Sequence, residues 1–128
     1  MCLLEAVQSW SPTEVVCQAH SHRRVDNPLR FAGRLGISAG IEYAAQAMAV
    51  HGALLAAEEA APCVGFLTSV RDVRWQRLCL DDVAGDLTVR AERLSGNAVS
   101  LLYQFSVEAA DAVLLSGRAS VLLQAPKA

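Results

Sequence analysis

The chain has 128 residues, a length that suits one domain with a single hydrophobic core, so we expect residues 1–128 to form one domain. Its formal net charge is −2, so no overall positive charge indicates a nucleic-acid partner. Apolar residues make up 53% of the sequence but aromatic residues only 5%, so the core has to be built mainly from Ala, Val and Leu.

The cysteines indicate a reducing compartment. They form no C-x-x-C pair, have no histidine at zinc-ligand spacing, and lie in or beside apolar runs, where a free cysteine behaves as a small buried hydrophobe. The N-terminus does not have the pattern of a signal peptide. We therefore expect a cytoplasmic protein without a metal site, in which four reduced cysteines are structural: Cys2, Cys17, Cys63 and Cys79.

The first third of the chain predicts two short strands and a polar loop. Residues 1–10 are apolar before a Ser-Pro turn, and residues 14–20 alternate between apolar and polar side chains. Residues 21–35 are rich in arginine and contain the turn Asn27-Pro28.

A long helix is predicted from Ile37 to Ala61. No proline interrupts this alanine-rich run, and Pro62 stops it. Because the run is apolar nearly all round, we expect the helix to be buried. Its uncharged part is too short to cross a membrane and includes Gln46 and His51, so no membrane span is expected.

Strands dominate the rest of the chain. Residues 64–80 alternate with a change of phase at Arg71-Asp72, which indicates a β-bulge. Residues 86–94, 99–107 and 113–123 alternate cleanly and are joined by short turns, so they should pair antiparallel. The element order predicts an α+β fold in which an antiparallel sheet wraps around one long central helix. Such a sheet leaves an edge strand, so pairing with a second copy is expected.

Candidate chemistry is confined to the loop and the start of the helix. An ordered set of residues lies there: His22, then Asn27-Pro28, then a helix that is led by Gly36 and carries Glu42 and Gln46 as E-x-x-x-Q. This set resembles the hot-dog-fold β-hydroxyacyl-acyl-carrier-protein dehydratases, most closely the small branch associated with aryl-polyene and related polyketide-type pathways. The resemblance implies a hot-dog fold and elimination of water from a 3-hydroxyacyl thioester to give the trans-2-enoyl thioester.

The resemblance also implies how the site is assembled. His22 of one subunit would face Glu42 of another across a dimer interface, and the acyl chain would arrive on the phosphopantetheine arm of an acyl carrier protein, with no other cofactor. A neutral imidazole suits the role of base for the C2 proton, because its unperturbed pKa is about 6.5. Glu42 suits the role of acid toward the leaving hydroxyl if burial raises its pKa. His20 is a second candidate for the base.

Other residues complete the expected site. Unpaired backbone N–H groups of the first helical turn, from about Ile37 to Gly40, would polarise the thioester carbonyl. Asn27 can act as a turn residue and Gln46 as a hydrogen-bond partner of Glu42. The expected substrate-binding residues are Asn27, Gly36, Ile37, Ser38 and Gln46. A carrier protein would dock on Arg23, Arg24, Arg30 and Arg34, unless these are simply solvated arginines.

Two other functions remain open. A hot-dog thioesterase has the same fold, but its acid activates water against the thioester carbonyl. A non-catalytic acyl-binding subunit would pair with a related active dehydratase. The sequence Arg-Arg-Val-Asp after His22 differs from the Phe-Pro-Gly of the main dehydratases and keeps this second alternative open. Homodimer and hetero-oligomer are both compatible with the sequence.

Overall fold

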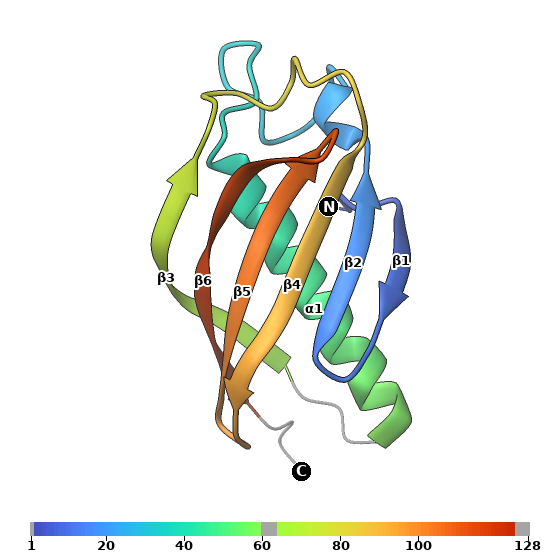
Figure 1. The fold of residues 1–128 in the computed structure, drawn as a ribbon, viewed down its shortest axis with the longest axis vertical. Helices are drawn as coiled ribbons and strands as arrows, with labels where there is room; N and C mark the ends of the chain where they lie inside the picture. Colours follow the sequence, from blue (N-terminus) through green and yellow to red (C-terminus); the bar gives the residue numbers. More distant parts are fainter. Residues whose placement is uncertain (1, 60–63, 125–128) are drawn as a thin grey trace.

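One antiparallel sheet curves over one long helix in the computed structural model of the protein, which describes residues 2–59 and 64–124 (Figure 1). The sheet has six strands in the order β1-β2-β4-β5-β6-β3. The predicted α+β arrangement is therefore confirmed. In chain order, the elements are β1 (Ala6–Trp10), β2 (Glu14–Ala19), the 3-10 helix η1 (Ser21–Arg23), α1 (Ala39–Glu59), β3 (Val64–Trp75), β4 (Leu87–Gly96), β5 (Ser100–Ala109) and β6 (Ala112–Gln124).

The core lies between the sheet and one face of α1. On β4, Leu87, Val89 and Ala91 are buried, as their alternation predicts, and β5 buries every second residue opposite them. Gly117 on β6 lies against the ring of Phe105, and a Cβ there would come 2.8 Å from the Phe105 Cζ atom. Glycine is needed at this position because the two strands and the ring fill the space.

The edge strand β3 contains the predicted bulge. Its register against β6 shifts between Arg71 and Arg74, and Asp72 has a positive φ of 55°. The strand ends at Trp75 and not at Leu80, so the sequence prediction was too long by five residues. The chain then forms a long connection, residues 76–86, which is tied to the start of the helix by hydrogen bonds on both sides of an isolated bridge between Gly36 and Cys79.

The helix is buried on one face only, which corrects the expectation of burial all round. Tyr43, Ala47 and His51 are completely buried against the sheet, whereas Glu42 and Ala49 lie on the outer, exposed face. The observed helix begins at Ala39, two residues later than predicted, and its predicted end at Ala61 lies outside the described residues. Within the described part of the chain, no helix is long and apolar enough to span a membrane.

The cysteines differ in burial. Cys17 is buried in the core and Cys79 is half-buried, but Cys2 is exposed, so its predicted burial is wrong. Cys63 lies outside the described residues. All three described cysteines are free thiols.

Candidate functional site

Three segments that are distant in the sequence meet at one end of the sheet. They are η1 with the loop that follows it, the start of α1, and the connection between β3 and β4 (Figure 1). Hydrogen bonds join the connection both to the segment before the helix and to His22. The residues that the sequence singles out for chemistry therefore come from this end of the molecule.

His22 is enclosed, and its two ring nitrogens have different environments. The imidazole is 0% exposed, and its Nε2 atom lies 3.0 Å from the carbonyl oxygen of Val83. Because a carbonyl can only accept, Nε2 carries the proton and Nδ1 is left with a free lone pair. Within the part of the chain that the structure describes, Nδ1 has no hydrogen-bond partner. Burial is the main cause that lowers the pKa of His22, and it outweighs the opposing effects of the Val83 and Gly85 backbone and of the Asp86 charge. His22 is thus a neutral base at pH 7.

A buried polar cluster fixes the turn that carries His22. The hydroxyl of Ser21 donates to the carbonyl oxygen of Leu3 over 2.7 Å, so the Tyr43 hydroxyl, also 2.7 Å away, has to donate to Ser21 Oγ. The Asn27 side chain donates from Nδ2 to the Tyr43 oxygen (3.1 Å) and to the Ser21 carbonyl (2.9 Å). Burial raises the pKa of Tyr43, so its hydroxyl keeps the proton that this cluster requires. The helix is linked in this way to the turn beside the imidazole.

Asn27 is committed to this cluster. One hydrogen of its amide is donated to the Ser21 carbonyl and the other to the Tyr43 hydroxyl of α1, and its Oδ1 atom accepts from the backbone N–H of Leu29 over 2.9 Å. No amide hydrogen is left for a substrate, so its expected role in substrate binding is replaced by a structural role as a turn residue. The sequence allowed for both readings.

Glu42 lies on the exposed outer face of α1, which corrects the expectation that it is buried in the chain. Within the described ranges, Glu42 and His22 are joined neither by a hydrogen bond nor by an ion pair. A single chain therefore does not bring the two groups together. Any pairing between them has to come from another subunit placed against the outer face of the helix.

The backbone donors at the start of the helix are mostly occupied, which corrects a second expectation. Ile37 N–H donates to the Leu78 carbonyl over 2.8 Å, and the N–H groups of Ala39 and Gly40 donate to carbonyls three residues earlier. Among the residues that the structure describes, Gly36 and Ser38 remain with N–H groups that have no backbone partner. Only these two could polarise a carbonyl without a rearrangement.

Two further residues that the sequence singled out, Gln46 and His20, make contacts within the chain. Gln46 accepts a hydrogen bond at Oε1 from the backbone N–H of Leu3 over 2.8 Å, so it anchors the N-terminal segment to the helix. His20 is exposed, and its Nε2 atom lies 3.5 Å from a carboxylate oxygen of Glu5. His20 and His22 are thus two residues apart but occupy opposite environments.

The four loop arginines are all engaged within the chain. Arg23 pairs with Asp86, Arg24 with Asp26, and Arg34 with Asp81 at N–O distances of 2.8–3.2 Å. Arg30 donates to three backbone carbonyls of its own loop, those of His22, Arg24 and Gly33. Because the nearby carboxylates balance most of this charge, the loop is a weaker docking surface for an acidic partner than the sequence suggests.

A second buried polar cluster lies further along the helix and was missed by the sequence analysis. His51 Nε2 lies 2.8 Å from the carbonyl of Ser11, so Nδ1 is bare and accepts from the Tyr103 hydroxyl at 2.6 Å. Arg93 donates to the Tyr103 oxygen over 2.9 Å. This cluster latches the β1–β2 turn onto the helix. The sequence signal for this cluster is a tyrosine in an alternating strand, whose hydroxyl needs a partner when buried, together with a histidine in an apolar helix.

Tyr43 was also missed as a site residue. It follows Glu42 directly but points to the opposite side of the helix, toward η1, with a fully buried side chain. A tyrosine in an otherwise aliphatic helix needs a partner for its hydroxyl when it is buried, and this requirement is visible in the sequence. The described residues contain no group of three or more His, Cys, Asp or Glu side chains that could hold a metal ion.

Comparisons with known proteins identify a dehydratase family for the chain. A family model described as ApeP-like, ApeP dehydratase, matches residues 1–127. A chain of the structure of the dehydratase heterocomplex ApeI:P from Xenorhabdus doucetiae aligns with a TM-score of 0.82 and 26% identity, over 98% of this chain and 84% of that chain. No curated protein matches the sequence.

Thioesterase structures share the fold at lower identity. Thioesterase HI1161 from Haemophilus influenzae aligns with a TM-score of 0.69 and 12% identity, over 93% of this chain and 77% of that chain. A mutant of the thioesterase SAV0944 from Staphylococcus aureus aligns with a TM-score of 0.70 and 15% identity, over 94% and 93% of the two chains. At these identities the likeness concerns the fold alone. The common arrangement of sheet and helix is the hot-dog fold that the sequence resemblance implied.

Proposed function

Since the chain belongs to the ApeP-like dehydratase family, we propose that it removes water from a 3-hydroxyacyl thioester carried on an acyl carrier protein. The product would be the trans-2-enoyl thioester of a fatty-acid-like or polyketide intermediate. The observation that carries the proposal is the state of His22, a buried neutral imidazole whose Nδ1 lone pair has no partner among the described residues. A desolvated, unprotonated imidazole suits the abstraction of a C2 proton at neutral pH.

In the proposed mechanism His22 Nδ1 takes the C2 proton, while its Nε2–H keeps donating to the Val83 carbonyl and fixes the tautomer. The leaving hydroxyl receives a proton from Glu42 of a neighbouring hot-dog subunit, or from a water that Glu42 positions. The N–H groups of Gly36 and Ser38 are the candidates to polarise the thioester carbonyl. His20 fits the role of base less well, because it is solvated and lies beside Glu5.

The site is completed by a second subunit in this proposal. Glu42 lies on an exposed helix face, and the structural match named above is a heterocomplex of dehydratases, so a hetero-oligomer of two hot-dog subunits is the arrangement we favour. The substrate is held by its phosphopantetheine arm, and no other cofactor is involved.

One observation favours the alternative of a non-catalytic subunit. His22 is completely enclosed in the isolated chain, so η1 and the connection 76–86 have to move before Nδ1 can meet a substrate. If they do not move, the imidazole serves only to hold the connection through Val83. The chain would then support the active site of a partner subunit.

The experiment is an assay of the purified chain with a 3-hydroxyacyl thioester of a carrier protein, followed for enoyl absorbance and for free thiol. Elimination by the chain, with enoyl thioester formed and no thiol released, is the expected result. Release of thiol without enoyl product indicates a thioesterase. If the chain forms neither product, both alone and together with a related dehydratase whose own histidine is replaced, it is a non-catalytic subunit.

A further inference from the structure

The sheet has two end strands, β1 and β3, and the longer one, β3, offers an edge for pairing with another chain. β3 is the last strand in the sheet order and pairs only with β6, so the other side of a strand of 12 residues is open. It exposes large apolar side chains, with Phe66 49% and Trp75 55% accessible. A long apolar edge strand that is left open favours pairing with a further strand. This inference rests on the proposed pairing of hot-dog subunits and concerns the choice of partner.

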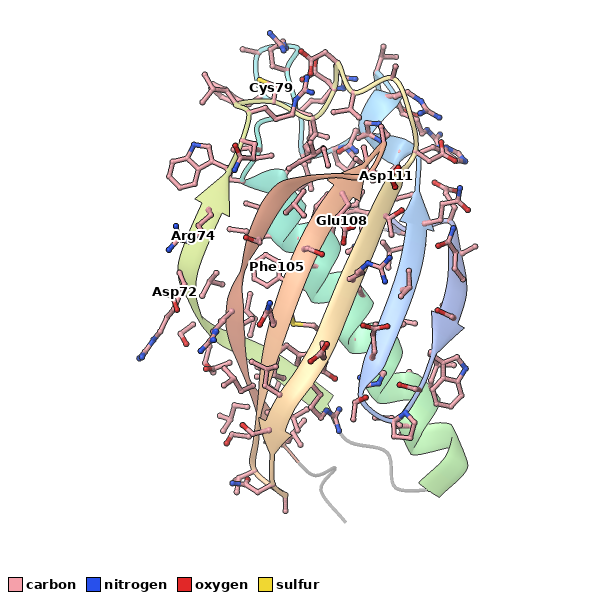
Figure 2. The ribbon with its side chains drawn as sticks, viewed as in Figure 1. Asp72, Arg74, Cys79, Phe105, Glu108 and Asp111 are labelled. Carbon is pink, nitrogen blue, oxygen red and sulfur yellow. The ribbon has the colours of Figure 1, made fainter. Side chains whose placement is uncertain are left out.

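Positive charge is concentrated beside this edge. Arg71 on β3 lies directly opposite Arg118 on β6, and Arg74 follows on the same face beyond the bulge. Figure 2 shows Arg74 and Asp72 extending from β3 at the margin of the sheet. All three arginines are exposed, and within the described ranges none of them pairs with a carboxylate. Like charges directly opposite each other on paired strands are unfavourable, so this patch lacks its counter-charge within the chain.

The patch is also hollowed. Arg71 and Arg118 line a groove of about 560 Å³ on the outer face of the sheet, together with Ser95, Asn97 and Ser120. The groove has one acid, Asp72, at the bulge. Three arginines against one aspartate leave a charge of +2 at the edge strand, whereas three of the loop arginines are balanced by Asp26, Asp81 and Asp86.

Pairing of β3 with its own copy would bring two such patches together. In an antiparallel pair centred on the middle of Val64–Trp75, Arg71 lies about three residues from its copy along the strands, which is roughly 10 Å. That separation is close to the Debye length of about 8 Å at physiological salt, so the repulsion is felt and depends on ionic strength. Self-pairing is therefore opposed by charge although the apolar edge favours it.

We infer that the edge strand β3 is matched to a different hot-dog subunit, one whose edge strand carries carboxylates on the outer face of the sheet. Arg71, Arg74 and Arg118 attract that partner and disfavour a second copy of this chain. Discrimination between partners requires such a repulsive element against the wrong pair as well as attraction to the right one. The apolar residues of β3 contribute affinity, and the three arginines determine which partner is bound.

The test uses a charge-reversed form of this chain as the acidic partner. The variant is Arg71→Glu/Arg74→Glu/Arg118→Glu, labelled with a fluorophore that distinguishes it from the wild type. Mixed and identical pairs are measured by sedimentation velocity and native mass spectrometry at 50 mM and 500 mM salt. We expect the mixed pair to bind roughly tenfold more tightly than either identical pair at low salt, and this preference to disappear at high salt.

Two further variants complete the design. Arg71→Gln/Arg74→Gln/Arg118→Gln removes the charge without reversing it and should self-associate more tightly than the wild type; it also covers the case in which the reversed variant does not fold. Arg24→Glu, in the exposed loop after η1, should leave pairing unchanged. The inference would be overturned if, at low salt, identical and mixed pairs formed in the ratio expected for random pairing. It would also be overturned if the glutamine variant self-associated no better than the wild type. Activity is not measured, so failure of the dehydratase proposal leaves this result intact.

Discussion

Replacing Tyr43 with phenylalanine removes one buried oxygen that links the helix to the turn carrying His22. The change deletes the bond to Ser21 Oγ at 2.7 Å and the bond from Asn27 Nδ2 at 3.1 Å. Ser21 and Asn27 keep their other partners, Leu3 and the Ser21 carbonyl, so neither group becomes fully unsatisfied. The free energy of unfolding should fall by about 1–2 kcal/mol, because each hydrogen bond contributes about 1 kcal/mol net.

The catalytic consequence separates positioning from simple stability. If the cluster holds the η1 turn in place, Tyr43→Phe should lower kcat for elimination about tenfold or more, with little change in KM, because small displacements of a base are costly. Tyr103→Phe is the matched control. It also removes two hydrogen bonds of a buried tyrosine, those to His51 and Arg93, and should lower the unfolding free energy by about 1–3 kcal/mol. It lies outside the proposed site and should leave kcat unchanged.

Urea denaturation and the enoyl absorbance assay on both variants decide the matter. Equal losses of kcat in Tyr43→Phe and Tyr103→Phe would show that the activity follows stability alone. An unchanged kcat in Tyr43→Phe, at reduced stability, would show that the cluster does not position a catalytic imidazole. Either result would rule out a role of the Tyr43 hydroxyl in positioning His22.

Three further outcomes follow from the structure. Burial lowers the pKa values of His22 and His51, so these residues bind protons more readily in the unfolded chain than in the folded one. The stability that they contribute should therefore be fully present above about pH 6.5 and should fall as the pH drops below it. His51→Asn should flatten this dependence in denaturation curves taken from pH 7.5 to 5. For the same reason kcat/KM should fall only below pH 6.5, and an activity that instead rises toward pH 5 would exclude a neutral His22 as base. In the helix, a Cβ at Gly52 meets open space, so Gly52→Ala should stabilise the protein by about 0.5–1 kcal/mol in thermal unfolding. Gly40→Ala places a Cβ 2.6 Å from Leu115 Cδ2 and should destabilise the protein by about 1–3 kcal/mol. The same sign for both changes would contradict the packing described.

Much of the fold is predictable from local pattern. The alternation on β4 and β5 and the bulge near Arg71 both follow from rules that act within a few residues, and the structure confirms them. The end of β3 was placed too late because residues 78–80 are again apolar. They are apolar for another reason, since they pair with the segment that leads into the helix.

The environment of each site residue was much harder to predict, because it depends on contacts between distant segments. Burial of His22 comes from the connection that contains Val83, 61 residues away. Exposure of Glu42 comes from a sheet that covers only one side of the helix, although the helix is apolar nearly all round. Arg23 and Arg34 pair with acids much further along the chain, Asp86 at 63 residues and Asp81 at 47 residues. None of these contacts leaves a signal in the local sequence.

In the proposed reaction the enclosed imidazole of His22, and not that of the exposed His20, takes the C2 proton of the substrate. The most direct measurement is the rate of elimination by His22→Ala and His20→Ala, each with its fold checked by circular dichroism and assayed beside the wild type with any partner subunit it requires. We expect a loss of about 10²–10⁴-fold for His22→Ala and a change of less than about threefold for His20→Ala. Wild-type elimination by a folded His22→Ala protein would contradict this expectation.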